Sequence, residues 1–250
     1  MALTDFLRVK IGLSAAIRSD GQSLAHAAKG CQRWRMTIKL DILSDPICPW
    51  CYIGKTSLDD ALELRSDHPF QIHWHPFQLN PDMPPGGMER QAYLDQKFGG
   101  QVNANHVYDR IAEAAKAAGL KLDLDGIKRT PNTIDAHRLI HWAGLEGCQD
   151  ATVTRLFKAY FEECRDIGDR SELLEIAEVA GLGRDATERL LGSDADIEEM
   201  RSRDAHARNR GVAGVPTFIV ADRHVLQGAQ PKDLWLRVLD ELCEQAEASS

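Results

Sequence analysis

Apolar and polar residues alternate along two short stretches, and an amphipathic stretch separates them. Residues 37–43 alternate and then run apolar, as a buried strand does, and residues 70–77 alternate again. Between them, residues 52–66 carry apolar side chains at helical spacing; these are Leu58, Ala61, Leu62 and Leu64. The order predicts a β-α-β unit, in which a right-handed crossover joins two parallel strands.

Helical patterns then follow one another from residue 88 to residue 210, without a strand pattern between them. They begin after a loop at 80–87 that is rich in proline and glycine. Asp169 and Glu172 fit a capping box for a helix that Gly181 closes. We therefore expect an inserted helical domain over residues 88–210.

The strand pattern returns at residues 215–220, turns at 221–223 and continues to Leu226, which predicts a β-hairpin. A last amphipathic helix begins at Pro231. The predicted fold class is α/β: residues 36–87 and 211–250 form one unit with a sheet, and an all-helical insertion interrupts it.

Composition limits the function classes. The chain has 250 residues, of which 43% are hydrophobic and 27% charged, and its net charge is −8. An acidic chain is a poor partner for nucleic acid or for an anionic membrane surface. No apolar run approaches the roughly 18 residues that a membrane-spanning helix needs.

Residues 1–35 fit no element of this plan. They match a secretory signal poorly, because Asp5 lies in the leading segment and Arg18 ends the apolar patch early. We expect a poorly ordered extension and a cytoplasmic protein.

The candidate chemistry lies in Cys48-Pro49-Trp50-Cys51, between the first strand and the first helix. With Cys48 at the N-cap, Pro49 takes the first helical position and Cys51 lies one turn further on the same face. The free N–H groups of a helix terminus favour a thiolate. We therefore expect Cys48 to be the exposed, acidic thiol and Cys51 the protected one. Cys148, Cys164 and Cys243 are expected to be free buried thiols.

Several further motifs accompany the Cys-x-x-Cys: Asp45-Pro46, residues 74–81, Pro131-Asn132-Thr133, Ala136-His137-Arg138, Gly214-Val215-Pro216-Thr217 and residues 227–230. With them the chain resembles the DsbA-like branch of the thioredoxin superfamily. Within that branch it resembles the FrnE-like oxidoreductases, which are dithiol–disulfide isomerases associated with polyketide biosynthesis. The resemblance covers residues 36 to about 247.

The resemblance implies a thioredoxin-like fold with a cis peptide bond at Val215–Pro216. It also implies that Val215, Pro216, Asn132 and His137 bind substrate, while a plainer interpretation makes Asn132 the cap of the helix that follows. Cys48 would attack a disulfide and Cys51 would resolve the mixed disulfide.

The expected partners are protein or small-molecule thiols and disulfides, with glutathione as a candidate co-substrate. No cofactor is expected beyond the redox-active pair. Trp50 carries no charge, and an ionised Asp45 would oppose the thiolate, so a mild oxidant is expected. The acidic insert is a candidate face for a homodimer.

Three alternatives compete with this interpretation. A zinc site would need further ligands, and only His137 and His141 are suitably spaced, so no metal is expected. The related 2-hydroxychromene-2-carboxylate isomerases activate glutathione's thiol, but they typically carry serine where Cys48 stands. A redox-inert peptide-binding module is the third; turnover of a model disulfide would exclude it.

Overall fold

The computed structural model describes residues 37–99 and 101–248 of the chain. The predicted extension over residues 1–35 lies outside these ranges. In the described part, no helix is both long and apolar enough to span a membrane.

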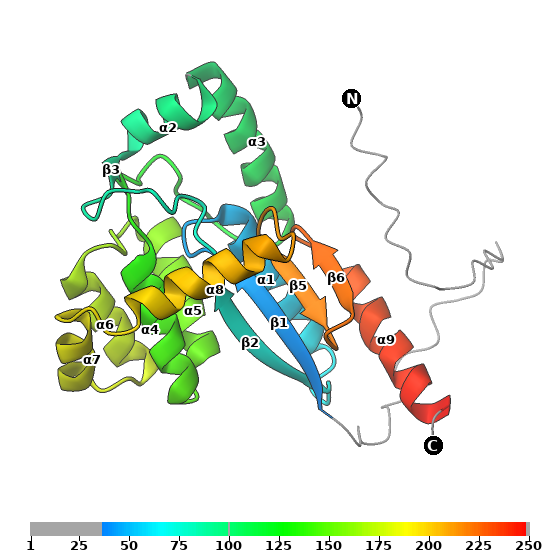
Figure 1. Ribbon diagram of the computed structural model, residues 1–250. Helices are drawn as coiled ribbons and strands as arrows, with labels where there is room; N and C mark the ends of the chain where they lie inside the picture. Colours follow the sequence, from blue (N-terminus) through cyan, green and yellow to red (C-terminus); the bar gives the residue numbers. More distant parts are fainter. Residues whose placement is uncertain (1–36, 100, 249–250) are drawn as a thin grey trace.

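A four-stranded sheet forms the centre of the fold (Figure 1), in the order β2-β1-β5-β6. Its strands are β1 (Ile38–Ser44), β2 (Phe70–Pro76), β5 (Thr217–Val220) and β6 (His224–Gln227). β1 and β2 run parallel, as the β-α-β pattern predicts. β5 joins the same sheet antiparallel to β1, with Ile42 opposite Phe218, and β6 completes the predicted hairpin.

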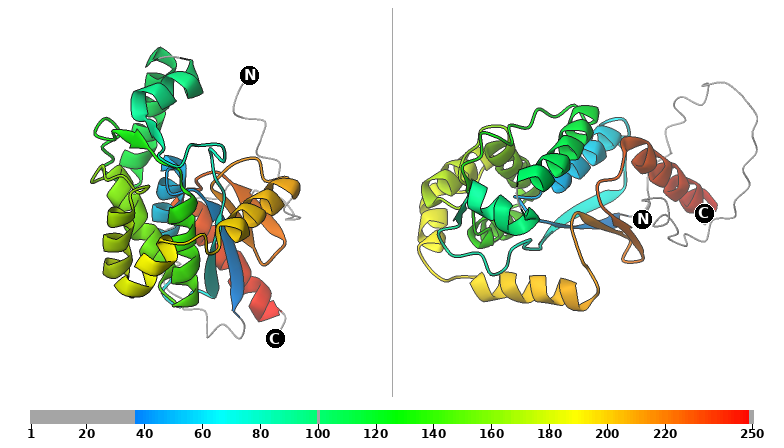
Figure 2. Two further views of the ribbon diagram at one scale, coloured as in Figure 1. Left: turned by 60° about the vertical axis from the view of Figure 1, so that its left-hand side comes forward. Right: turned by 90° about the horizontal axis from the view of Figure 1, so that it is seen from above.

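Alternation along β1 sends side chains to two differently covered faces. Leu40 and Ile42 are fully buried (0% exposed) in the core that α1 (Pro49–Glu63) and α9 (Lys232–Ala248) complete. Leu43 points the other way and packs with Ala207 of α8 (Ile197–Asn209). The views of Figures 1 and 2 agree that α8 crosses the face of the sheet opposite α1 and α9. In α1, the predicted inner position Leu64 is wrong, because Leu64 lies past the end of the helix and is 59% exposed.

The position of α8 departs from the expected domain plan. The sequence pattern put this helix inside the inserted helical domain, yet it packs on β2 and on α4. Helical periodicity shows which side of a helix is apolar, but not which neighbour covers that side. α8 is therefore part of the layer that covers the sheet.

The remaining helices follow β2 and precede α8 along the chain. They are α2 (Arg90–Phe98), α3 (Gln101–Ala117), α4 (Ile134–Leu145), α5 (Gln149–Phe161), α6 (Arg170–Ala180) and α7 (Arg184–Leu191). Side chains from α4, α5 and α6, such as Leu139, Phe157 and Ile176, belong to one apolar core with Leu40 and Ile42 of the sheet. α2 and α3 form an arm whose second helix rests on α1 (Figures 1 and 2).

The insertion is not all-helical, and that prediction is wrong. Strands β3 (Met88–Glu89) and β4 (Arg129–Thr130) form a separate two-stranded antiparallel sheet. Two residues per strand are too few to produce an alternating pattern, so the hydrophobic pattern did not indicate these strands.

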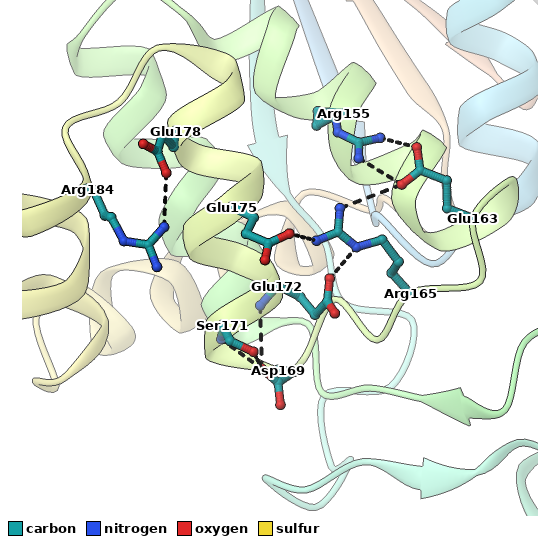
Figure 3. Close-up of polar contacts among 9 residues, drawn as sticks. All are labelled: Arg155, Glu163, Arg165, Asp169, Ser171, Glu172, Glu175, Glu178 and Arg184. Carbon is teal, nitrogen blue, oxygen red and sulfur yellow. Dashed lines mark hydrogen bonds and ion pairs between the residues drawn. The ribbon is translucent and has the colours of Figure 1, made fainter.

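The start of α6 confirms one half of the predicted capping box. The Asp169 carboxylate accepts hydrogen bonds from the N–H groups of Ser171 and Glu172, and Gly181 ends the helix with a φ of 101°. Glu172 does not return to the cap; it pairs instead with Arg165, which also contacts Glu175 at 2.5 Å (Figure 3). These ion pairs hold the loop between α5 and α6 against α6.

Candidate active site

The Cys-x-x-Cys motif occupies the junction of β1 and α1. Cys48 is the N-cap of α1 with extended backbone angles, and Pro49 stands at the first helical position, both as predicted. The Cys48 N–H donates to the carbonyl of Asp45 (2.9 Å), and the Cys51 N–H donates to the carbonyl of Cys48 (3.0 Å). The turn after β1 therefore sets the first cysteine at the positive end of the helix dipole.

Both thiols are free and both are buried. Cys48 is 4% exposed and Cys51 is 1% exposed. The expected order of protection is correct, but Cys48 is not the exposed thiol that we predicted. The loop between α8 and β5 covers it, and the Cys48 thiol lies 3.6 Å from the Val215 carbonyl oxygen.

Burial makes Cys51 a weaker acid than an ordinary thiol. Removal from water raises the pKa of Cys51 well above its usual value, and the neighbouring Cys48 sulfur raises it further. Contacts to Ser44 and to the backbone of Asp45 act in the opposite direction and are weaker. Cys51 therefore holds its proton more firmly than an ordinary thiol.

The loop that covers Cys48 contains the cis peptide bond Val215–Pro216, as the resemblance implied. The Pro216 carbonyl accepts the N–H of Gly228 at 2.8 Å, which ties the loop to the end of β6. Gly54 of α1 permits the close approach, because a Cβ at this position would meet Pro216 and Phe218 at 3.3 Å. Nothing in the sequence pattern had singled out Gly54.

Asp45 lies beneath the same turn and is completely buried. Its carboxylate accepts the N–H groups of Leu79 (2.6 Å) and Ile47 (3.3 Å). Burial raises the pKa of Asp45 to about 7, and these hydrogen bonds only partly offset the shift. At neutral pH the group is therefore only partly ionised, and it opposes a thiolate less than the sequence alone led us to expect.

His137 lies beside Asp45 and is buried. Its side chain is 2% exposed, and its Nε2 atom lies 3.8 Å from the Asp45 carboxylate. Burial lowers the pKa of His137 to about 4, and its ring also bonds to the Phe77 backbone. The Nε2 atom has no hydrogen-bond partner among the described residues. α4 thus turns the ring into the core beside Asp45, and the substrate contact of His137 stays a prediction.

Asn132 acts as the plainer interpretation proposed. Its side-chain oxygen accepts the N–H of Ile134, the first residue of α4, at 3.0 Å. Its amide donates to the carbonyl of Met83 at 2.6 Å, which ties the start of α4 to the preceding loop. Both ends of the side chain are thus used within the protein.

Trp50 is half-buried and contacts two apolar clusters. It packs on the main core and also on the apolar cluster that Ile53 of α1 forms with Ile111 and Ala115 of α3. The arm of α2 and α3 thereby reaches the helix that carries the thiols. Among the described residues, no three His, Cys, Asp or Glu side chains lie together as metal ligands.

Lys55 is a buried charged residue of α1 that the sequence analysis missed. It lies four residues after Cys51 on α1, and only 2% of its side chain is exposed. Its ammonium group pairs with Asp59 (2.7 Å) and Asp150 (2.9 Å), which joins α1 to the start of α5. Lysine side chains are usually exposed to solvent, so the hydrophobic pattern did not indicate that Lys55 is buried and ion-paired.

Cys148 and Cys164 are free and half-buried, whereas Cys243 is disulfide-bonded, so the prediction of a free thiol there is wrong.

Comparison with known proteins gives a consistent result. The model of the DSBA-like thioredoxin domain matches residues 39–240. The chain is 28% identical to a probable DsbA oxidoreductase of Streptomyces coelicolor, with a TM-score of 0.73 and coverage of 85% of this chain and 91% of that one. A 2-hydroxychromene-2-carboxylate isomerase has the same fold, at 20% identity and a TM-score of 0.65, with coverage of 85% and 99%. So does the cytosolic disulfide reductase DsbM of Pseudomonas aeruginosa solved with glutathione, at 23% identity and a TM-score of 0.58, with coverage of 82% and 99%.

Proposed function

The chain belongs to the family of DSBA-like thioredoxin domains, and on that premise we propose that it is a thiol–disulfide oxidoreductase with Cys48 and Cys51 as its redox pair. One observation carries the proposal. Cys48 caps α1, Cys51 follows one turn later, and the Val215 carbonyl lies 3.6 Å from the Cys48 sulfur. The second cysteine has a use only if it resolves a mixed disulfide, so a protein without redox exchange would not need it.

Cys48 performs the first step as a thiolate. It attacks one sulfur of a substrate disulfide, so that a Cys48–substrate disulfide forms and the other substrate sulfur leaves as a thiolate. The N-terminus of α1 stabilises the attacking anion. The raised pKa of Asp45 keeps a full negative charge away from this helix end for part of the time at neutral pH.

Cys51 performs the second step. The neighbouring sulfur of Cys48 raises the pKa of Cys51 in the reduced protein. Once Cys48 is bonded to substrate, its negative charge is gone and Cys51 loses its proton more easily. Cys51 then attacks Cys48, the Cys48–Cys51 disulfide forms, and the substrate leaves with both electrons and takes up a proton. In reverse, the oxidised pair donates a disulfide.

The loop at Val215–Pro216 positions the substrate. Val215 is half-buried, and its carbonyl oxygen lies 3.6 Å from the Cys48 sulfur. An extended peptide or a peptide-like thiol would pair with this backbone as an added strand does. Glutathione is such a molecule, and we propose it as the thiol that recycles the oxidised pair. The glutathione in the DsbM structure, which shares the fold, supports this choice.

The test is the turnover of a model disulfide, such as the inter-chain disulfides of intact insulin, in a glutathione buffer. Cys48→Ser removes the attacking sulfur and should lower the rate by roughly a hundredfold or more. Cys51→Ser keeps the attack but lacks the resolving step, so mixed disulfides with substrate should accumulate and be visible by mass spectrometry. Cys164→Ser removes a free, half-buried thiol far from the pair in sequence and is the matched control. It should leave the rate unchanged.

Two outcomes would overturn the proposal. Full activity of Cys48→Ser would remove the assigned nucleophile. A glutathione-dependent isomerisation that survives both substitutions would favour the isomerase class, because such an enzyme activates the thiol of glutathione and needs none of its own.

A further inference from the structure

A second concave site lies on the face of the sheet that carries α8. It is a groove of about 990 Å³ between α8 and the strands β1, β5 and β6. In Figure 1 this region lies where α8 crosses the sheet beside β5 and β6. Neither redox cysteine lines it, since α1 covers the other face. The groove is therefore separate from the proposed active site.

The acidic side chains of the groove already have partners. Asp41 receives Lys39 and His75, each at 2.7 Å. Glu199 pairs with Arg203, also at 2.7 Å. Asp222, the third acid of the lining, lies 3.4 Å from Lys39. Lys39 and Arg203 offset two of these three negative charges, because Asp41 and Asp222 share Lys39 and burial lowers the pKa of His75.

Two cations of the same surface are not compensated. Arg210, at the end of α8, and Arg223, in the β5–β6 turn, both line the groove. Their side chains have no hydrogen-bond or ion-pair partner among the described residues. In a chain with a net charge of −8, two unpaired guanidinium groups at one concavity are unexpected. The planar guanidinium group matches the geometry of carboxylates, sulfonates and phosphates.

The floor of the groove is apolar. α8 covers this face only in part, so Ile219 stays half-buried and Val225 is 40% exposed. Leu43 and Val212 complete the apolar lining. Pockets for small molecules combine such an apolar floor with a few placed polar groups.

From the unpaired arginines above an apolar floor, we infer that this groove binds a small organic anion: a carboxylate, sulfonate or phosphate group attached to an apolar body. The anionic group contacts Arg210 and Arg223, and the apolar body covers Ile219 and Val225. The site is independent of thiol chemistry at Cys48.

The probe for this site is 8-anilinonaphthalene-1-sulfonate, whose fluorescence rises on binding. It is titrated into the folded full chain and, in parallel, into the Cys48→Ser variant, which verifies that binding does not need the redox pair. We expect saturation near one probe per chain. N-phenyl-1-naphthylamine has the same apolar body without the sulfonate, and it reports the apolar contribution alone.

Three variants distinguish the outcomes. The double variant Arg210→Gln/Arg223→Gln should weaken binding of the sulfonate by roughly tenfold or more, while the uncharged probe changes little. Val225→Asp places an anion on the floor and should also weaken it. Arg201→Gln, on α8 but outside the lining, is the matched control and should bind as the parent does. All four substituted positions are exposed, and far-ultraviolet circular dichroism verifies that each variant is folded.

The inference fails if the sulfonate does not saturate near one per chain, or if the double variant binds it as tightly as Arg201→Gln does. It fails as well if the double variant weakens both probes equally, because the arginines would then not be selecting an anion.

Discussion

Asp45 and His137 show how strongly burial changes the chemistry of single residues. They lie 3.8 Å apart, and their side chains are 0% and 2% exposed. Burial shifts the pKa of each group in the direction that favours its neutral form. For the acid this means a rise to about 7, and for the base a fall to about 4. Next to the helix terminus that we propose to hold a thiolate, an uncharged pair disturbs the electrostatics less than two free charges would.

These shifts predict an unusual pH dependence of stability. The folded protein keeps the Asp45 proton up to about pH 7, while the unfolded chain loses it near 3.8, so ionisation of Asp45 lowers the free energy of unfolding as pH rises through this window. His137 acts oppositely. The unfolded chain binds its proton below about 6.5 and the folded protein only below about 4, so this contribution to stability is lost as pH falls from 6.5 to 4.

Asp45→Asn removes the first effect and leaves the second. We therefore expect the free energy of unfolding of the variant, relative to that of the parent, to rise by roughly 1–4 kcal/mol between pH 4 and pH 7. Urea unfolding at a series of pH values measures it. The lost hydrogen bond does not depend on pH, so it shifts the curve without changing its slope. Asp82→Asn, at an exposed position, is the control; equal slopes for the parent and the Asp45 variant would contradict the prediction.

At the scale of the elements, the ends of the helices decide how the pieces join. Cys48 caps α1 with its backbone, and Asp169 caps α6 with its carboxylate. Arg138 of α4 donates a hydrogen bond to a carbonyl at the end of α7. The last case is a long-range cap. The buried Arg138 guanidinium donates to the carbonyls of Leu190 (2.6 Å), in the last turn of α7, and of Ser193 (2.8 Å), just past its end.

Replacement of Arg138 should therefore be costly even by lysine. Arg138 is fully buried, also donates to the Ala195 carbonyl at 2.6 Å, and lies 4.8 Å from the Trp142 ring. The single ammonium group of lysine cannot reproduce this fork, and buried carbonyls are left without donors. We expect Arg138→Lys to lower the free energy of unfolding by about 3 kcal/mol, measured in urea. Arg184→Lys, on the exposed side of α7, should change it by less than about 1 kcal/mol. Equal effects of the two substitutions would show that the cap contributes little.

At the scale of the whole molecule, the described helices and the sheet share one core. Leu40 of β1, Trp235 of α9 and Phe157 of α5 belong to the same buried apolar cluster. α3 adds a second contact through Ile111 and Ile53, and α8 adds a third on the far face of the sheet. We expected one domain over residues 36–87 and 211–250 and a separate one over residues 88–210. The shared core instead joins residues from both ranges.

The shared core predicts cooperative unfolding. Two independent domains would melt in two steps, whereas one core opens as a unit. We expect a single calorimetric transition whose calorimetric and van't Hoff enthalpies agree. Ile111→Ala should move that whole transition to lower temperature, because truncation of a buried isoleucine costs roughly 2–5 kcal/mol. Two resolved transitions, with only one of them moved by Ile111→Ala, would restore the two-domain plan.

The sequence by itself determined the elements whose signals are local. Alternation placed β1, β2 and the β5–β6 hairpin, helical spacing placed α1 and α9, and proline after Cys48 placed the thiols at a helix start. These signals arise from neighbours along the chain, so no knowledge of the fold is needed to find them.

Only the tertiary structure decided which surfaces meet. Leu79 and His137 come to Asp45 from distant parts of the chain, and their approach, not the identity of Asp45, sets its environment. The same holds for α8 on the sheet, for the burial of Cys48 under the Val215 loop, and for the groove with Arg210 and Arg223. The physical reason is common to all of them. A periodic pattern records that one side of an element avoids water, whereas burial, pKa and ligand shape depend on which other element covers that side.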